Sequence, residues 1–133
     1  MRILVAEDDA VSRRVIEAVL TRLGHDCEST EDGEAAWARF QRDQPDVLIT
    51  DWMMPGVAGP ELCKLVRAAY GTDCYVIMLT ALTGGPEIRT AWEAGADDFL
   101  TKPLDRTQLA MRLAVVERLK SLQHRVTELE RKA

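Results

Sequence analysis

The chain has 133 residues, a length that fits one domain with its own hydrophobic core. Hydrophobic residues make up 47% and charged residues 29%, a balance typical of folded globular proteins and unlike that of disordered chains. The net charge is −5, and the acid excess lies in residues 1–103, which argues against broad binding to a nucleic-acid backbone.

The cysteine count and the first residues bear on the cellular compartment. Three cysteines without a C-x-x-C pair, and only two histidines, predict no zinc site and favour a reducing cytoplasm. The first apolar run, residues 3–6, is far too short to span a membrane. We therefore expect a cytoplasmic protein that is neither secreted nor inserted in a membrane.

Short apolar runs alternate with amphipathic stretches five times along the chain. The predicted strands are residues 3–6, 27–30, 47–50, 75–80 and 98–100. The helices between them show apolar residues at three- and four-residue spacing, and glycine or proline marks their ends. The marking residues are Gly24 after the first helix, Pro45 after the second, Pro60 and Pro86 at the starts of the third and fourth, and Gly95 after the fourth.

Such alternation predicts a parallel sheet covered by helices on both faces. Ligands of such sheets bind beyond the carboxyl ends of the strands, so the residues just after each strand are candidates for a functional site. Acidic residues Glu7 and Asp8 follow the first strand, and Asp51 follows the third. Thr80 ends the fourth strand, and Lys102 follows the fifth.

These strand-end residues favour one chemistry when they are taken together. Crowded carboxylates repel one another unless a cation neutralises them, and ligands that offer only oxygen point to a hard ion such as Mg²⁺. A carboxylate, a metal, an ammonium group and a hydroxyl suit a phosphoryl group with three electron-rich oxygens. Each residue alone has an ordinary role; Asp9, for example, is expected to cap the first helix.

Four segments resemble the receiver domain of bacterial two-component response regulators. Residues 3–8 (ILVAED) resemble the first strand and acidic pair of this family, and residues 51–55 (DWMMP) with Gly59 resemble its D-x-x-M-P-x-x-x-G phosphoacceptor signature. Thr80-Ala81 resembles the switch hydroxyl and its small neighbour, and residues 95–103 (GADDFLTKP) resemble the GADD-aromatic-x-x-K-P block. The resemblance covers about residues 2–118, and it departs in Glu7, where the family more often has Asp, and in a glycine-rich segment at 83–86.

The resemblance implies a flavodoxin-like (βα)5 three-layer sandwich with strand order 2-1-3-4-5. It implies that Asp51 accepts a phosphoryl group from a histidine kinase or a phosphotransfer protein, and that Thr80 and Lys102 bind the phosphoryl oxygens. Phe99 would be the aromatic switch residue, and the Lys102-Pro103 bond would be cis. The implied Mg²⁺ ligands are Glu7, Asp8, Asp51 and the carbonyl of Met53.

The last predicted helix begins near Asp105 and continues beyond what a receiver requires. We expect a receiver domain at residues 1–118 and a helical extension at 119–133. An apolar heptad stripe runs along this helix; its residues are Val115, Leu119, Leu122, Val126, Leu129 and Ala133. The stripe predicts a homodimer through a short coiled coil, which can also be the start of a linker to an effector, with an exposed solvated helix as the alternative. No helix-turn-helix follows, so direct DNA binding is not expected.

The sequence thus predicts a phosphorylation-operated signalling switch rather than an enzyme with turnover. An aspartate-based Mg²⁺ phosphatase is an alternative, but such enzymes need a second acid where this chain has Met53. A scaffold that works without phosphorylation is the other alternative, and the intact set of Asp51, Thr80 and Lys102 argues against it.

Overall fold

The computed structural model describes residues 1–81 and 85–132, in which five strands alternate with five helices. The strands are β1 (Arg2–Ala6), β2 (Asp26–Thr30), β3 (Val47–Asp51), β4 (Tyr75–Thr80) and β5 (Asp98–Thr101). The helices are α1 (Ala10–Arg22), α2 (Gly33–Asp43), α3 (Gly59–Tyr70), α4 (Gly85–Ala94) and α5 (Arg106–Lys132). Every predicted strand is present, while residues 83–84 of the glycine-rich segment lie outside the described residues.

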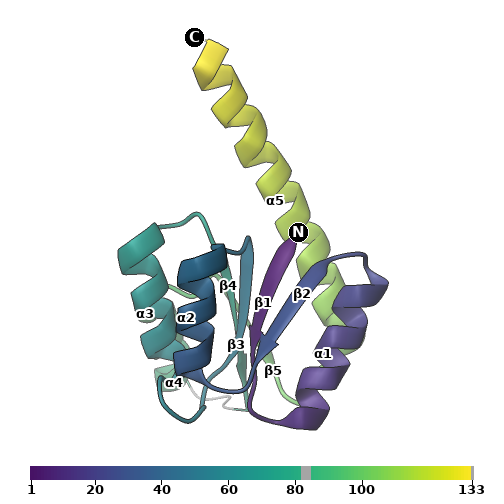
Figure 1. Ribbon diagram of the computed structural model, residues 1–133, viewed down its shortest axis with the longest axis vertical. Helices are drawn as coiled ribbons and strands as arrows, with labels where there is room; N and C mark the ends of the chain where they lie inside the picture. The colour runs from purple at the N-terminus through teal and green to yellow at the C-terminus, as the bar shows by residue number, and fades with distance from the viewer. Residues whose placement is uncertain (82–84, 133) are drawn as a thin grey trace.

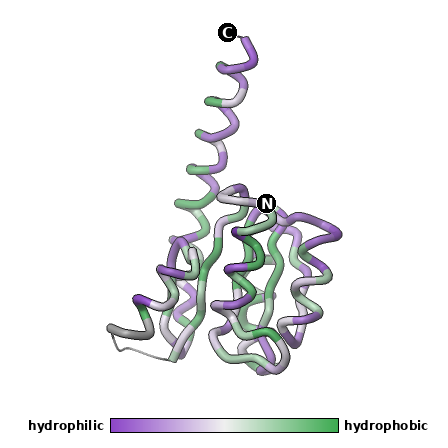
Figure 2. Tube along the Cα trace, turned by 90° about the vertical axis from the view of Figure 1, so that its left-hand side faces the viewer, coloured by the Kyte–Doolittle hydropathy of each residue, from purple (hydrophilic) through white to green (hydrophobic). Residues whose placement is uncertain are grey.

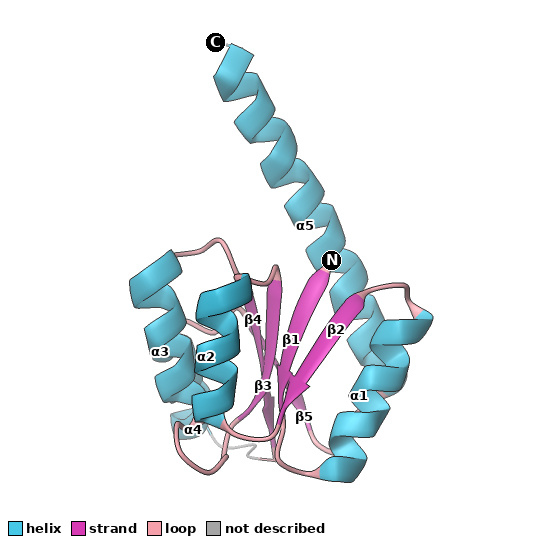
Figure 3. Ribbon diagram, in the orientation of Figure 1, coloured by secondary structure: helices cyan, strands magenta, loops and turns pink. Residues whose placement is uncertain are grey.

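The strands form one parallel sheet in the order β2-β1-β3-β4-β5, as predicted (Figure 1). Helices α2, α3 and α4 cover one face of the sheet, and α1 and α5 cover the other (Figure 3). Since all strands are parallel, their carboxyl ends lie along a single edge. The flavodoxin-like three-layer fold is therefore confirmed.

Alternating side chains of the central strands fill two separate hydrophobic cores. Leu4, Leu48 and Met78 point toward α2, α3 and α4, where they pack around residues such as Phe40. The residues next to them in the strands point to the other face and pack against α1 and α5; they are Ile3, Val5, Val47, Ile49, Ile77 and Leu79. A strand buried on both faces reads as a continuous apolar run, which explains the short runs seen in the sequence.

The ends of α1 follow from side-chain chemistry. The Asp9 carboxylate accepts a hydrogen bond from the backbone N–H of Ser12, so the predicted N-cap is confirmed. Gly24 adopts a φ of 85° just after the helix. Val11 and Leu23 are exposed, whereas the buried residues of α1 are Ile16 and Leu20, which face the sheet.

Helix α5 runs past the sheet and projects from the body of the molecule (Figure 1). Its last buried residue is Val116, and apolar residues recur along the projecting part, which is otherwise polar (Figure 2). The uninterrupted helix is confirmed, whereas the domain boundary at residue 118 stays a prediction. Among the described residues, no helix is both long enough and apolar enough to cross a bilayer.

Candidate functional site

The sheet brings the predicted site residues to one edge. Ala6 pairs with Thr50 across β1 and β3, so Glu7 and Asp51, each one residue further on, come side by side. Thr80 and Thr101 pair at the ends of β4 and β5, and Lys102 directly follows Thr101. The position of each side chain is thus set by the register of neighbouring strands.

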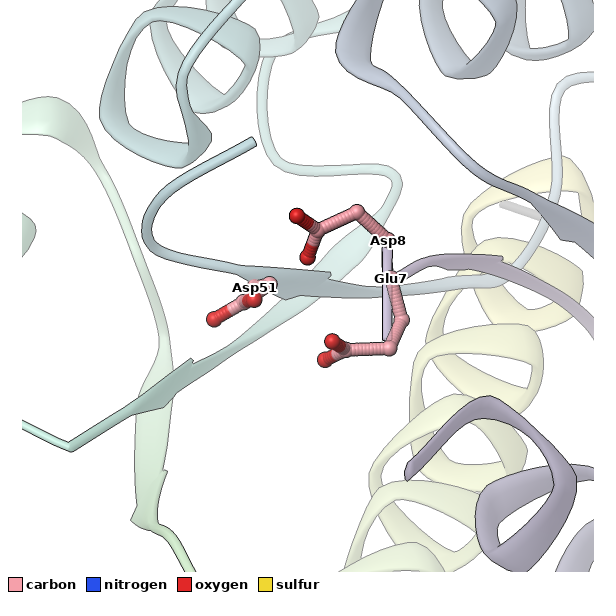
Figure 4. A group of neighbouring side chains, drawn as sticks. All are labelled: Glu7, Asp8 and Asp51. Carbon is pink, nitrogen blue, oxygen red and sulfur yellow. The ribbon is translucent and has the colours of Figure 1, made fainter. Parts of the chain in front are cut away.

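Three carboxylates converge at this edge (Figure 4). Glu7, Asp8 and Asp51 each offer an oxygen, and these oxygens lie within 4.8 Å of one another. Glu7 is fully buried and Asp51 is 8% exposed, whereas Asp8 faces solvent. The cluster is therefore open on the side of Asp8 and closed on the side of Glu7.

Lys102 supplies the positive charge of the site. Its Nζ lies 3.0 Å from Oδ2 of Asp51 and donates hydrogen bonds to Asp51 and to Oε1 of Glu7. Oε2 of Glu7 also lies 3.0 Å from Nζ, but this buried oxygen accepts no hydrogen bond from the residues that the structure describes. The backbone N–H of Asp9 donates to Oε1 of Glu7 as well. One ammonium group thus joins two acids that are far apart in the sequence.

The electrostatics of the pair follow from burial and from close opposite charges. Burial raises the pKa of Glu7, and the hydrogen bond from Lys102 offsets only part of that effect. For Lys102, burial lowers the pKa, but the hydrogen bonds to Glu7 and Asp51 outweigh it, so the pKa is raised overall. Lys102 therefore stays cationic between Glu7 and Asp51.

The backbone fixes the other oxygen of Asp51. Oδ1 accepts a 2.8 Å hydrogen bond from the N–H of Trp52, whose carbonyl in turn accepts a bond from Gly59 at the start of α3. The same Trp52 N–H lies 2.9 Å from the carbonyl oxygen of Leu79 on β4. Asp51 is thereby fixed through Trp52, which is bonded to β4 and to the first turn of α3.

The remaining predicted residues lie around this centre. Thr80 is buried, and its carbonyl accepts a 2.8 Å hydrogen bond from the N–H of Lys102. Phe99 is half-buried and packs edge-on against Trp92 of α4, with ring centroids 5.4 Å apart. The side chain of Met53 is exposed, and the Lys102-Pro103 bond is cis, as expected.

The structure adds one supporting residue that the sequence did not single out. Arg13 of α1 donates a 2.9 Å hydrogen bond from Nη1 to the carbonyl of Glu7, and its Nη2 lies 3.4 Å from Glu31. The sequence predicted this helix, but it contains several arginines. The only sequence signal that distinguishes Arg13 is its position about one turn after the start of α1. Arg13 holds the loop that carries the acidic pair.

Known proteins that resemble this chain belong to one family. The family described as "Response regulator receiver domain" matches residues 3–114. The chain belongs to this family. Receiver domains act as phosphorylation-operated switches that take a phosphoryl group from histidine kinases, and the acidic cluster is consistent with an aspartate phosphoacceptor.

Individual relatives agree with the receiver assignment. The "Chemotaxis protein CheY homolog" of Campylobacter jejuni is 42% identical over 106 residues, which cover 77% of this chain and 82% of that protein. The "Probable transcriptional regulator ycf27" of Porphyridium aerugineum is 38% identical over 117 residues, covering 88% of this chain and 48% of its own length. This receiver thus spans about half the length of some curated relatives.

Solved structures show the same fold. The receiver domain of the Francisella response regulator 1452 superposes with a TM-score of 0.83 at 30% identity, covering 90% of this chain and 98% of that one. CheY4 of Vibrio cholerae superposes with a TM-score of 0.81 at 29% identity, covering 86% of this chain and 97% of that one.

Proposed function

We propose that Asp51 accepts the phosphoryl group, from a histidine kinase or a histidine phosphotransfer protein. The observation that carries the proposal is the contact of Lys102 Nζ with Asp51, at 3.0 Å, beside the fully buried Glu7. A carboxylate can act as the nucleophile, and the ammonium group held beside it stabilises the negative charge of the phosphoryl oxygens during the transfer. In the transfer, an Asp51 oxygen bonds to phosphorus while the phosphorus–nitrogen bond of phosphohistidine breaks, and its electron pair stays on the imidazole.

The donor set of the site fits Mg²⁺. Glu7, Asp8 and Asp51 offer only oxygen, and the buried Oε2 of Glu7 has no hydrogen bond in the described part of the chain. We propose these three carboxylates and the Met53 carbonyl as the residues that hold the ion. When bound, Mg²⁺ would supply charge neutralisation for the phosphoryl oxygens.

The switch residues are proposed to respond to the added phosphoryl oxygens. Thr80 at the end of β4 would bind one of these oxygens, and Lys102 would bind another while keeping its contact with Glu7. The movement of Thr80 would change the space available to Phe99, and so shift an existing equilibrium between two conformations. The expected result is a changed partner surface at α4 and β5.

The two alternative functions have less support. The position two residues after Asp51 holds Met53, whose exposed thioether cannot act as the second acid of a phosphatase. A scaffold without phosphorylation would not need Lys102 between two acids. We place the switch in the cytoplasm, as a protein that can form a homodimer through α5.

Labelling with acetyl phosphate tests the phosphoacceptor. The wild-type chain should gain one phosphoryl mass in Mg²⁺, and Asp51→Asn should gain none, because the amide keeps the shape but loses the nucleophile. Asp26→Asn, at the opposite end of the sheet, is the matched control and should be labelled like wild type. Normal labelling of the Asp51→Asn variant would contradict the assignment, and steady turnover of a small phosphorylated molecule would favour a phosphatase.

A further inference from the structure

The projecting part of α5 carries an apolar stripe that the body of the molecule leaves uncovered. The side chains of the stripe are between 42 and 67% exposed; they are Val115, Leu119, Leu122, Val126 and Leu129. They alternate at four- and three-residue spacing, which places Leu119 and Val126 at heptad position a and the other three at position d. Such a stripe is the seam of a coiled coil rather than the wide face of a core helix.

The stripe is free to meet a second helix. Leu109, Leu113 and Val116 pack against the sheet, and at 100° per residue the stripe lies on average about 120° round the helix from them. The stripe also begins at Val115, where the buried part of α5 ends. The receiver body therefore lies to one side of the seam, where Leu119 borders a pocket with Tyr75 and Asp97, and it leaves the opposite side open to a partner.

Charges beside the seam discriminate between the possible partners. Position g holds Arg118, Arg125 and Lys132, all basic, whereas position e holds Gln123 and Glu130 after Val116, which is buried against the sheet. In a parallel pair, g of one helix faces e of the following heptad in the other, so Arg125 meets Glu130 twice, and Arg118 meets Gln123. In an antiparallel pair g faces g, which sets arginine against arginine. The flanking charges are thus complementary to the same helix in parallel register.

We propose that α5 pairs with α5 of a second copy of this chain as a parallel, in-register coiled coil over residues 115–132. The proposal rests on the homodimer named above and adds its orientation, register and charge pairs. Val126 at a between Leu122 and Leu129 at d is a combination typical of two-stranded parallel coils. Because the seam is short, the dimer is in exchange with the monomer, and its two receivers lie at the same end of the coil.

Reversal of one charge tests the orientation. In a parallel pair, Arg125→Glu sets a new carboxylate opposite Glu130, and the dimer Kd, measured by analytical ultracentrifugation of the full chain, should rise about tenfold, or about 1.4 kcal/mol. The double variant Arg125→Glu, Glu130→Arg restores the opposite charges and should return the Kd to near the wild-type value. His124→Glu, at the outward position f, is the matched control and should leave the Kd unchanged.

Cross-linking tests the register. Leu129→Cys should form an intermolecular disulfide under mild oxidation, because the two copies of residue 129 face each other in a parallel pair; Arg131→Cys at outward position f and the wild-type chain should not. An unchanged or tighter dimer in Arg125→Glu, or no cross-link at residue 129, would overturn the orientation while leaving the homodimer in place. A chain that stays monomeric at several hundred micromolar would overturn both, and neither result touches the labelling of Asp51.

Discussion

Asp8 differs from the other two acids in its exposure, and this difference defines what it can do. Glu7 and Asp51 already contact Lys102, whereas Asp8 faces solvent at the open side of the cluster. A buried acid with a partner serves the fold and the site together. An exposed acid with two acidic neighbours is destabilising by itself, and a bound cation would remove that repulsion.

Replacement of Asp8 by Asn should therefore affect metal binding far more than folding. Addition of Mg²⁺ to the wild-type chain should change the fluorescence of Trp52, whose N–H is bonded to Asp51. In Asp8→Asn the apparent Kd for Mg²⁺ should rise at least tenfold, while the urea midpoint stays the same or increases. Trp52→Phe identifies the reporting residue, and an Mg²⁺ titration unaffected by Asp8→Asn would place the ion elsewhere.

Helix α3 begins at Gly59, where the backbone lies close to the end of β3. A Cβ at this position would lie 2.3 Å from the carbonyl oxygen of Asp51 and 2.8 Å from Sδ of Met78. The helix therefore begins against the end of β3 at a distance that only glycine allows. This close approach links the first turn of α3 to the backbone of the proposed phosphoacceptor.

Gly59→Ala should thus lower both stability and labelling. We expect a loss of about 2 kcal/mol in the free energy of unfolding, as for other overpacked sites, together with slower phosphoryl uptake because the Asp51 backbone must shift. Gly71→Ala is the control: it meets no atom within 4 Å, and its cost comes only from a φ of 59°. Urea denaturation measures the loss of stability, and acetyl phosphate labelling measures the rate of phosphoryl uptake. Equal losses in Gly59→Ala and Gly71→Ala would show that the close contact of Gly59 with Asp51 is not important.

Helix α4 and strand β5 meet through one aromatic pair near the switch residues. Phe99 is half-buried, and Trp92, which packs edge-on against it, is 51% exposed. A movement of Phe99 has to change the surroundings of Trp92 and the exchange of nearby amides. This pair therefore offers a readout of the proposed switch that is separate from the phosphoryl group itself.

Thr80→Ala should still accept the phosphoryl group, but the conformational response of α4 and β5 should be weaker. The reason is that the hydroxyl that would bind a phosphoryl oxygen is gone. After phosphorylation, amide exchange in β5 and α4 should change clearly in wild type and by less than half as much in the variant. Thr101→Ala, which pairs with Thr80 in the sheet but is exposed, is the control. The proposed coupling fails if wild type and Thr80→Ala show the same exchange changes.

The sequence predicted elements more completely than it predicted contacts. The strands, the helix ends and the placement of Glu7, Asp51 and Lys102 at one edge of the sheet could be predicted. These features depend only on local sequence pattern and on the order of the strands. The hydrogen bonds from Lys102 to Glu7 and Asp51, and the clamp of Arg13 on the Glu7 carbonyl, depend on side-chain reach across the folded sheet. The exposure of Val11 likewise depends on where α1 contacts the sheet.

His25 connects the amino terminus, the segment before β2 and helix α5. Its Nδ1 lies 3.1 Å from the amino terminus, and its Nε2 lies 3.1 Å from Glu117 of α5. Burial lowers the pKa of His25, the positive amino terminus lowers it further, and Glu117 acts in the opposite direction. The folded protein therefore holds a neutral imidazole that accepts from the ammonium group and donates to the carboxylate.

This arrangement predicts a loss of stability in acid. Because the folded pKa lies below the unfolded value of about 6.5, the stabilisation is complete above pH 6.5 and is lost as the pH falls through the folded pKa. His25→Gln should show a smaller fall in unfolding free energy between pH 7 and 5 than wild type. His124→Gln, which replaces an exposed histidine of α5, should match wild type. Identical pH profiles for wild type and His25→Gln would rule out this origin.

The projection of α5 also has a mechanical consequence. Glu117 and Lys120 still contact the body, through His25 and the carbonyl of Asp73, so the rigid projecting arm is residues 121–132, about 18 Å long. A tilt of one degree at the base of this arm displaces its far end by about 0.3 Å, and a tilt of five degrees by about 1.6 Å. A rearrangement too small to reshape the receiver surface would therefore reach anything attached to the end of this helix as an ångström-scale movement.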